Sequence, residues 1–308
     1  MLNSKINKQD YQNFINNINY GYSLISKKNF EEIDKKGFTI INSDKNYWEK
    51  NEIDFDYLEQ KSDNLCIEEG IEGGWENEKP KGRNWEPSAQ RISNLPNKDK
   101  IYLKLAKLPD LLKGVNYVIK KPFKFSSMQI RNPLPNSDRQ ELHIDWRPRV
   151  FNYYNYNQCT GFIYMNDSNE QNGSLYIYPG THKILGNPSD DYIKKNNLKF
   201  EILSVKKYNI VLLNIYTWHY GGKNIDGKPR RTIFCNYRER SELQQLNQKK
   251  FLSKETLENM NEFEKYLFAV REKDKTQSDW IYKNRNSYFV KMYQKTRDIL
   301  YHKFLQKL

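Results

Sequence analysis

The sequence predicts a mainly β core with helical regions at both ends, in which the strands form a sandwich or a barrel. From residue 121 onward, short apolar runs alternate with turn sequences at even spacing, which is typical of such β structures. Before and after this part, apolar side chains recur every three or four residues, which indicates amphipathic helices. The 308 residues are 37% apolar, with 23 Tyr, 15 Phe and 6 Trp, so the core can be large and rich in aromatic rings.

The N-terminal part is predicted to contain helices and one strand. Apolar spacing indicates a helix over residues 8–34, and residues 37–42 are the first clear strand. Residues 43–100 have the weakest pattern; within them, residues 72–75 and 80–87 have loop-like sequences, in which Trp75 and Trp85 either anchor a long surface loop or belong to a lid over a pocket. Residues 99–120 return to helical spacing.

Eight strands are predicted for the core. They cover about residues 126–131, 141–147, 158–166, 173–178, 201–205, 209–215, 218–222 and 230–238. The long insertion at 184–200 is a candidate substrate loop. Residues 241–308 are predicted to form helices that pack on the core or mediate a homo-oligomer, with a nucleic-acid-binding tail as the alternative. We treat residues 1–308 as a single domain, with support at about 30–120, the core at 121–240 and a helical extension at 241–308.

The net charge of +13 is concentrated in the predicted core and the C-terminal region. Residues 1–120 hold 19 Lys/Arg and 19 Asp/Glu, residues 121–240 hold 18 and 10, and residues 241–308 hold 14 and 9. Such an excess favours an anionic substrate through long-range steering, or it is a solvated basic surface. The chain has no nucleic-acid motif and no basic run of five, so nucleic acid is not the expected partner.

Cysteine usage and apolar runs indicate a cytoplasmic protein. Cys66, Cys159 and Cys235 are odd in number and widely spaced, which fits neither a disulfide framework nor a zinc motif. The N-terminus lacks the apolar stretch of a signal peptide. No apolar run reaches the roughly 20 residues of a membrane span, so we expect no membrane contact.

A candidate metal site centres on residues 141–145. On a strand, residues two positions apart point to the same face, so His143 and Asp145 are expected to converge. The chain has 4 histidines, and His219 ends an apolar run that resembles a strand. Two histidines and one carboxylate make the facial triad that binds non-haem Fe(II) and leaves positions open for substrate and oxygen.

A candidate anchor for a co-substrate follows the third histidine. Arg230 stands eleven positions after His219, and its guanidinium can hold a carboxylate through two hydrogen bonds. This contact is what the distal carboxylate of 2-oxoglutarate needs. Arg231 is expected to point to the opposite face and to be solvated. The hydroxyl of Thr232 shares the face of Arg230, where it gives a second hydrogen bond or is simply a β-branched strand residue.

Other polar residues near these positions are weaker candidates. Gln129 lies on the strand before the triad and is a possible polar contact to the co-substrate, and Arg131 shares its face. His182 lies in a turn sequence and is interpreted as a motif or substrate-side residue. His302, on a predicted C-terminal helix, is interpreted as a surface residue.

Four segments resemble the phytanoyl-CoA dioxygenase family of Fe(II)- and 2-oxoglutarate-dependent oxygenases. They are residues 31–41, 143–146, 172–183 and 219–230, in the same order as in the family. The third segment, Asn172-Gly-Ser-Leu-Tyr-Ile-Tyr-Pro-Gly-Thr-His-Lys183, is the most specific because metal geometry alone does not require it. The resemblance covers about residues 31–240.

This resemblance implies a double-stranded β-helix, or jelly roll, of eight strands with the triad on the adjacent second and seventh. It implies that His143, Asp145 and His219 hold Fe(II), that 2-oxoglutarate chelates the metal and reaches Arg230, and that O2 is the oxidant. The implied reaction is hydroxylation of an unactivated C–H bond of a small organic substrate, with release of succinate and CO2. Related halogenases lack the carboxylate, so Asp145 favours oxygen transfer.

Two alternatives stay open at this point. The same chemistry could act on a protein or a nucleic acid, which the positive charge would suit. A non-catalytic member of the fold could bind a ligand or a partner, although the intact triad and Arg230 argue against it.

Overall fold

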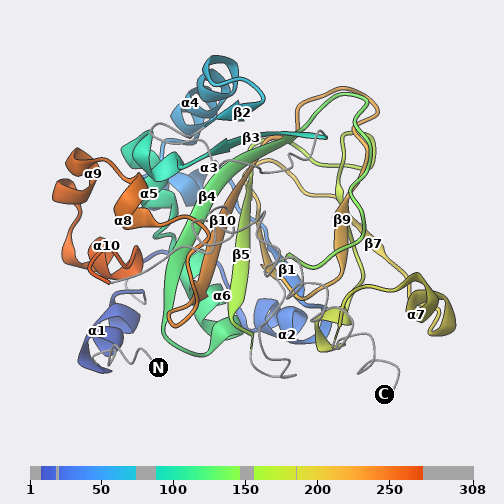
Figure 1. Ribbon diagram of the computed structural model, residues 1–308, viewed down its shortest axis with the longest axis horizontal. Coiled ribbons are helices and arrows are strands. Elements are labelled where there is room, and N and C mark those ends of the chain that lie inside the picture. Colours follow the sequence, from blue (N-terminus) through green and yellow to red (C-terminus); the bar gives the residue numbers. More distant parts are fainter. Residues whose placement is uncertain (1–7, 19–20, 74–87, 146–155, 185, 273–308) are drawn as a thin grey trace, which may run out of the picture.

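Two facing β-sheets and a layer of helices make up the protein. The computed structural model describes residues 8–18, 21–73, 88–145, 156–184 and 186–272. Within these ranges, most helices lie against the larger sheet, on the side away from the smaller sheet (Figure 1). The predicted fold class, a mainly β core with flanking helices, is confirmed.

The larger sheet has seven strands in the order β1-β8-β5-β10-β4-β3-β2. Its neighbouring strands are antiparallel except for the parallel pair β2 and β3. The strands are β1 (Phe38–Ile41), β2 (Glu72–Gly73), β3 (Ala89–Ser93), β4 (Phe123–Pro133), β5 (Gln158–Tyr164), β8 (Ile210–Asn214) and β10 (Thr232–Glu239). The N-terminal strand β1 pairs with β8, so the start of the chain belongs to the same sheet as the predicted core.

The smaller sheet has three strands in the order β7-β6-β9. They are β6 (Leu175–Ile177), β7 (Glu201–Leu203) and β9 (His219–Gly221). On the free side of β9, an isolated antiparallel bridge joins His143 to His219. The segment with the candidate ligands therefore runs along the edge of this sheet.

The two faces of the larger sheet have separate apolar cores. On β10, Ile233, Cys235 and Tyr237 point toward the helices and belong to the larger core. Phe234 points the other way and packs on a second core between the sheets, with residues such as Phe162 of β5. This alternation follows from the period of two along a strand, and it leaves one inner face for a site.

Ten helices occur among the described residues. They are α1 (Lys8–Ile18), α2 (Lys27–Lys36), α3 (Lys45–Lys50), α4 (Phe55–Glu68), α5 (Lys100–Leu105), α6 (Pro109–Ile119), α7 (Asp190–Lys195), α8 (Gln248–Phe251), α9 (Lys254–Asn259) and α10 (Glu262–Leu267). Two short 3-10 turns, η1 (Leu95–Asn97) and η2 (Thr181–Lys183), complete the set. No helix in the described part of the chain is long and apolar enough to span a membrane.

The prediction of one helix over residues 8–34 is wrong, because α1 ends at Ile18 and α2 begins at Lys27. The backbone amides of Leu24 and Ile25 donate to the buried carboxylate of Asp110, at 2.9 and 2.6 Å. These bonds hold residues 24 and 25 out of the helical conformation. The partner lies on α6, so apolar spacing near the N-terminus could not reveal it.

Residues 43–100, whose sequence pattern is the weakest in the chain, contain helices and strands. Helices α3 and α4 lie there, and each begins at an aspartate whose side chain accepts from a backbone amide of the first turn, Asp44 from Tyr47 and Asp54 from Tyr57. Strand β3 joins the edge of the larger sheet. Trp75 and Trp85, the candidate lid residues, lie outside the described residues.

Seven of the eight predicted core strands occur, and the eighth, predicted for 141–147, is not a strand over its described residues, 141–145. His143 pairs with His219 through a single bridge, in which each backbone amide donates to the other residue's carbonyl at 3.0 Å. Residues 142 and 145 lie in bends. The two residues His143 and Asp145 therefore approach each other through a bent loop rather than along a pleated strand.

Helices follow the last strand, as predicted. Met260, Leu267 and Phe268 of this region are buried in the core on the helical side of the larger sheet. Residues 273–308, which include His302, lie outside the described residues. The insertion at 184–200 contains α7, which projects from the edge of the molecule at the lower right of Figure 1 and has no buried residue.

Candidate active site

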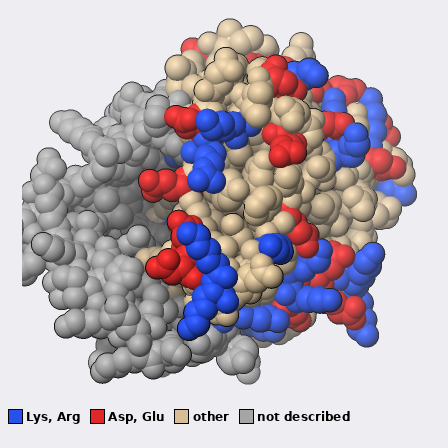
Figure 2. Space-filling view, turned by 90° about the vertical axis from the view of Figure 1, so that its right-hand side faces the viewer, with Lys and Arg blue, Asp and Glu red and all other residues tan. Residues whose placement is uncertain are grey.

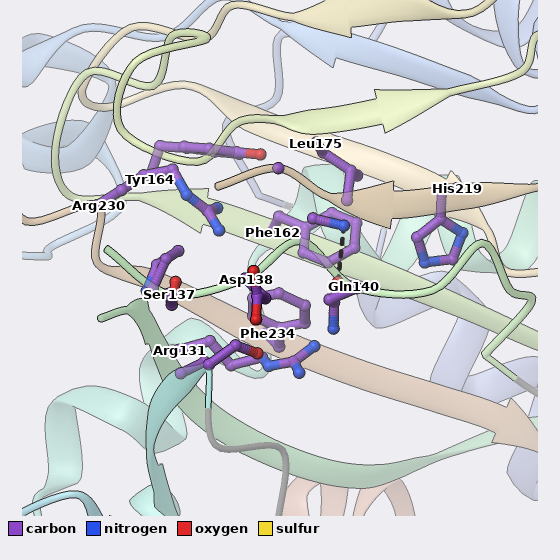
Figure 3. A pocket seen from close by; sticks show the side chains of 15 residues that line it. Arg131, Ser137, Asp138, Gln140, Phe162, Tyr164, Leu175, His219, Arg230 and Phe234 are labelled. Atoms are coloured by element: carbon purple, nitrogen blue, oxygen red, sulfur yellow. Dashed lines mark hydrogen bonds between the residues drawn. The ribbon is translucent and has the colours of Figure 1, made fainter. Parts of the chain in front are cut away.

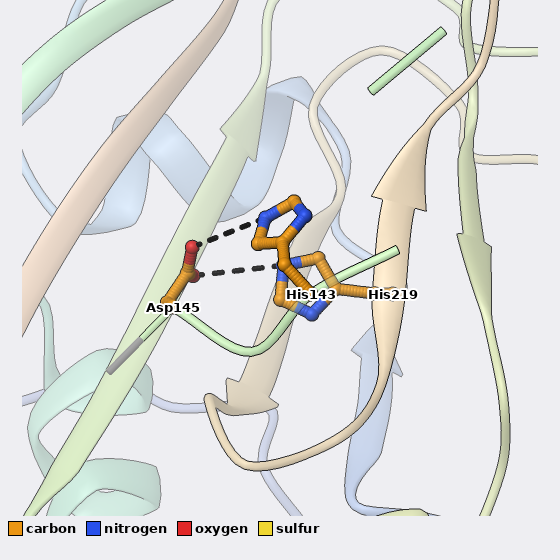
Figure 4. Close-up of side chains that lie close together, drawn as sticks. All are labelled: His143, Asp145 and His219. Atoms are coloured by element: carbon orange, nitrogen blue, oxygen red, sulfur yellow. Dashed lines mark ion pairs between the residues drawn. The ribbon is translucent and has the colours of Figure 1, made fainter. Parts of the chain in front are cut away.

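His143, Asp145 and His219 converge at the edge of the smaller sheet (Figure 4). One ligand atom of each lies within 4.8 Å of the others. Nε2 of His143 and Nε2 of His219 each lie 3.6 Å from a carboxylate oxygen of Asp145. His219 is buried, whereas the side chains of His143 and Asp145 are 31% and 29% exposed, so the group is reached from one side. Its donor set is the one that Fe(II) takes in facial-triad enzymes.

Each imidazole is oriented by a carbonyl of its own chain segment. Nδ1 of His143 lies 2.6 Å from the carbonyl oxygen of Glu141, and Nδ1 of His219 lies 2.8 Å from that of Thr217. A neutral imidazole that donates through Nδ1 has its lone pair on Nε2. Both Nε2 atoms therefore face Asp145 as acceptors for a metal, in the way that outer hydrogen bonds usually orient metal ligands.

Asp145 is held in its ionised form. Desolvation raises its pKa, but the neighbouring His219 and His143 outweigh this effect and bring the pKa of Asp145 well below its usual range. Desolvation lowers the pKa of His143, yet hydrogen bonding to Asp145 and its charge produce a net rise. An anionic carboxylate between two imidazoles favours a divalent cation, whose charge replaces that of the protons.

A pocket joins His219 to Arg230. Figure 3 shows Arg230 and Tyr164 at one end and His219 at the other, with Phe162 and Phe234 along the wall. Arg230 is only 6% exposed, and in the described part of the chain its Nε has no hydrogen-bond partner. Burial lowers the pKa of this guanidinium, and Tyr164 opposes the shift. A buried cation with an unused donor fits a carboxylate.

The other candidate co-substrate residues are placed differently. Thr232 is fully buried, and its Oγ1 accepts from Nη1 of Arg230 at 3.3 Å. Arg131 lines the pocket, with its guanidinium 5.2 Å from the ring centroid of Phe234. Gln129 lies opposite Phe234 on β4 but is not among the residues that line the pocket. Tyr164, which the sequence analysis missed, lies opposite Thr232 and becomes visible only from the strand pairing.

Arg231 is not solvated, contrary to the prediction. Its Nη1 lies 2.9 Å from Oδ1 of Asp63 on α4, and its side chain is 19% exposed. Arg231 does point away from Arg230, as alternation along a strand requires. The opposite face is covered by helix α4, which the sequence pattern did not predict, and its partly exposed Asp63 pairs with Arg231 there.

His182 is not one of the candidate metal ligands. It belongs to the packing around Thr217, the residue that orients His219. Its side chain is 5% exposed, and burial lowers its pKa to about 4, so the ring is neutral. Gly37 packs against it so closely that a Cβ there would lie 2.6 Å from Nδ1 of His182 and 2.2 Å from Oγ1 of Thr217. Thr217 in turn provides the carbonyl that orients His219. Two of the four family-like segments, 31–41 and 172–183, therefore meet at Thr217, next to the third candidate ligand.

The chain matches one family and shares its fold with several solved structures. The model of the family described as phytanoyl-CoA dioxygenase matches residues 69–232. EctD from S. alaskensis with bound Fe is 14% identical, with a TM-score of 0.55 over 73% of this chain and 82% of that chain. The carbocyclase SnoK from nogalamycin biosynthesis is 15% identical, with a TM-score of 0.54 over 70% and 84%. HygX from Streptomyces hygroscopicus, with nickel, 2-oxoglutarate and hygromycin B bound, is 15% identical, with a TM-score of 0.53 over 72% and 90%.

Identities this low show a common fold, and they confirm the double-stranded β-helix. No curated protein matches the chain. Because the family match spans more than half of its residues, the chain belongs to the phytanoyl-CoA dioxygenase family, and it is an oxygenase that depends on Fe(II) and 2-oxoglutarate.

Proposed function

We propose that this protein hydroxylates an unactivated C–H bond of a small organic molecule, with His143, Asp145 and His219 as the iron ligands. Arg230 and Thr232 hold the distal carboxylate of 2-oxoglutarate in this proposal. The observation that carries it is the pocket that runs from His219 to the buried, partly unpaired guanidinium of Arg230. A dicarboxylate would bind the metal through one end and pair with the guanidinium of Arg230 through the other.

The residues contribute positioning and charge. Iron with 2-oxoglutarate and O2 supplies an oxidant for an unactivated C–H bond, with succinate and CO2 as co-products. Asp145 brings a negative charge and the two imidazoles bring neutral donors, which leaves positions on the metal open. Phe162 and Phe234 give the pocket apolar walls that exclude water from the co-substrate. The positive charge of Arg131 at the same pocket adds to the attraction for a dianion.

A small-molecule substrate is supported by the proteins that share the fold. One EctD structure contains 2-oxoglutarate and 5-hydroxyectoine, and one HygX structure contains hygromycin B. An anionic substrate has less support. On the face that carries the smaller sheet, basic and acidic side chains are intermixed (Figure 2), with ion pairs such as Lys36–Glu201 and Lys206–Asp167. The excess positive charge is therefore not gathered into one steering surface there.

An anaerobic titration of the purified protein with Fe(II) and 2-oxoglutarate tests the proposal. Chelation of 2-oxoglutarate to the iron gives a weak visible charge-transfer band. We expect the band in the wild-type protein and its loss in His219→Ala, because the metal loses its buried ligand. A folded wild-type protein without the band would contradict the catalytic assignment and favour a ligand-binding role.

A further inference from the structure

Three polar side chains form a row on the inner face of the larger sheet. Asn236 of β10 lies between Thr160 of β5 and Ser127 of β4 in the strand register. Two residues earlier on β10, Phe234 lies opposite Phe162, and both line the pocket that contains His219. Because residues two positions apart share a face, the row faces the same interior space as that pocket.

The row lies at the level of the proposed metal site, beyond the co-substrate pocket. The backbone amide of Asp145 donates to the carbonyl of Ile215 at 3.3 Å. Ile215 follows Asn214 of β8, which pairs with Cys159, the residue next to Thr160. Arg230 is at the other end, before the first residue of β10. The order along the interior is therefore co-substrate anchor, metal ligands and polar row.

The side chains of the row are buried and joined by hydrogen bonds. Oγ1 of Thr160 donates to Oδ1 of Asn236 at 2.8 Å, Nδ2 of Asn236 donates to Oγ of Ser127 at 3.0 Å, and Oγ of Ser127 donates to Oε1 of Gln245 at 2.8 Å. These bonds fix the positions of the polar groups. They leave one amide hydrogen and one lone pair of Asn236 unused among the described residues, since an amide has two donors and two acceptor positions.

The row carries no charge. Its members are two hydroxyls and one carboxamide. The guanidinium of Arg238, the next residue on this face of β10, is directed to Oε1 of Gln158 and to the carbonyl of Leu243. A neutral hydroxyl or amide of a ligand can both donate to and accept from such a row. An alkyl chain at the same place would leave the unused amide hydrogen and lone pair of Asn236 without partners, which disfavours its binding.

We propose that Ser127, Thr160 and Asn236 recognise a neutral hydroxyl or amide group beside the carbon that is oxidised. The substrate class is then a small neutral polyol or amide, and a long-chain acyl thioester is excluded at this position despite the family's description. The inference rests on the proposed function, because it takes the triad as the metal site.

Succinate release by the full-length protein with Fe(II), 2-oxoglutarate and O2 tests this assignment. One set of probes is myo-inositol, glucose and N-acetylglucosamine, and the other is octanoyl-CoA and palmitoyl-CoA. We expect at least one neutral probe to stimulate succinate release by about tenfold or more, and the acyl thioesters by less than about twofold. Thr160→Val and Asn236→Leu are expected to lose about tenfold of the stimulation.

Thr39→Val is the matched control. Thr39 is as buried as Thr160 but lies on the helical side of the same sheet, where it bonds to Glu32 and Asn29 of α2. This variant is expected to respond to the probes as the wild type does. The charge-transfer band is recorded for each variant, and its absence in the wild type would mean that the proposed function fails, not the row.

If the wild-type protein shows the charge-transfer band, three outcomes would overturn the assignment of the row. They are stimulation by the acyl thioesters, no stimulation by any neutral probe, and undiminished stimulation in both row variants. Thermal unfolding of each variant separates loss of recognition from loss of folded protein.

Discussion

At the scale of single residues, Arg230 and Arg231 have different partners although they are neighbours. Arg230 is buried beside Tyr164 in the pocket, and Arg231 is paired with Asp63 of α4 on the opposite face. The two side chains carry the same charge, and Arg231 is the more exposed of the two. Substitution at each position therefore separates a contribution to co-substrate binding from a contribution to stability.

We expect Arg230→Gln to raise the Kd for 2-oxoglutarate by about 100-fold, which corresponds to about 3 kcal/mol for a buried charge pair. The titration of the charge-transfer band with 2-oxoglutarate measures this change. Arg231→Gln is the control, and it should leave the Kd within about twofold while it lowers Tm through the loss of about 1 kcal/mol. An equal effect of both changes on the Kd would refute the role assigned to Arg230.

We expect Asp145→Ala to reduce 2-oxoglutarate-dependent succinate release to background, because the metal loses its only anionic protein ligand in the proposed site. The assay measures succinate from the Fe(II)-loaded variant at saturating 2-oxoglutarate. Asp191→Ala on the exposed helix α7 is the control and should retain full activity. Full activity of Asp145→Ala would exclude the triad assignment.

The sequence identified individual side chains where the pattern is local. The candidate triad and Arg230 followed from short spacings and from the family resemblance. The structure brings the three triad residues together, and one pocket joins His219 to Arg230. Two contacts could not be predicted from the sequence, that of Arg231 with Asp63 and that of Arg230 with Tyr164. These contacts depend on which strands and helices become neighbours, and spacing along the chain does not contain that information.

At the scale of secondary-structure elements, the corner between α2 and β1 supports the loop that carries His219. Gly37 has φ +87°, and it contacts Thr217 and His182. Gly180 has nearly the same backbone conformation, φ +81°, but the nearest atom to an added Cβ is 3.5 Å away. Both glycines therefore have a positive φ that favours glycine, but only Gly37 lies too close to its neighbours to accept a Cβ.

We expect Gly37→Ala to destabilise the protein by about 1–3 kcal/mol more than Gly180→Ala, because only Gly37 also meets an overpacked contact. Denaturant unfolding of both variants measures the difference. Since Thr217 orients His219, Gly37→Ala should also weaken Fe(II) binding, measured as the iron concentration for half of the charge-transfer band. Equal losses in both variants would show that backbone strain alone is responsible.

The elements themselves were predicted where their apolar pattern is long or regular. Seven core strands and the helices after the last strand have such patterns. The segment at 141–147 alternates like a strand, yet among its described residues, 141–145, only His143 forms a β-bridge, because the chain bends at residues 142 and 145. Helix α4 was missed although Asp54 has the position of an N-cap, since charged and polar residues interrupt its apolar stripe.

At the scale of the whole molecule, the buried His182 makes stability depend on pH. Its pKa of about 4 in the folded protein is below that of an unfolded histidine, so the unfolded state binds the proton more readily. The stabilising contribution is complete above about pH 6.5 and is lost as the pH falls toward 4. It amounts to about 3 kcal/mol.

We expect the difference in unfolding free energy between wild type and His182→Gln to shrink by about 3 kcal/mol as the pH falls from 7 to 4. Glutamine cannot titrate, and the other acidic groups cancel in the comparison. Urea unfolding at pH 7, 5.5 and 4 measures the difference. A constant difference across this range would show that His182 is protonated as easily in the folded state as in the unfolded state.

The pairing of β1 with β8 determines when the protein can assemble during synthesis. Phe38 lies opposite Leu213, so the first strand has no partner until the chain has grown beyond residue 214. At about 5–20 residues per second, the nascent chain waits roughly 10–30 s with this strand unpaired. Contacts so distant in sequence also slow folding itself. His219, one of the residues proposed to bind iron, also lies beyond residue 214, so iron loading is an event that follows translation of most of the chain.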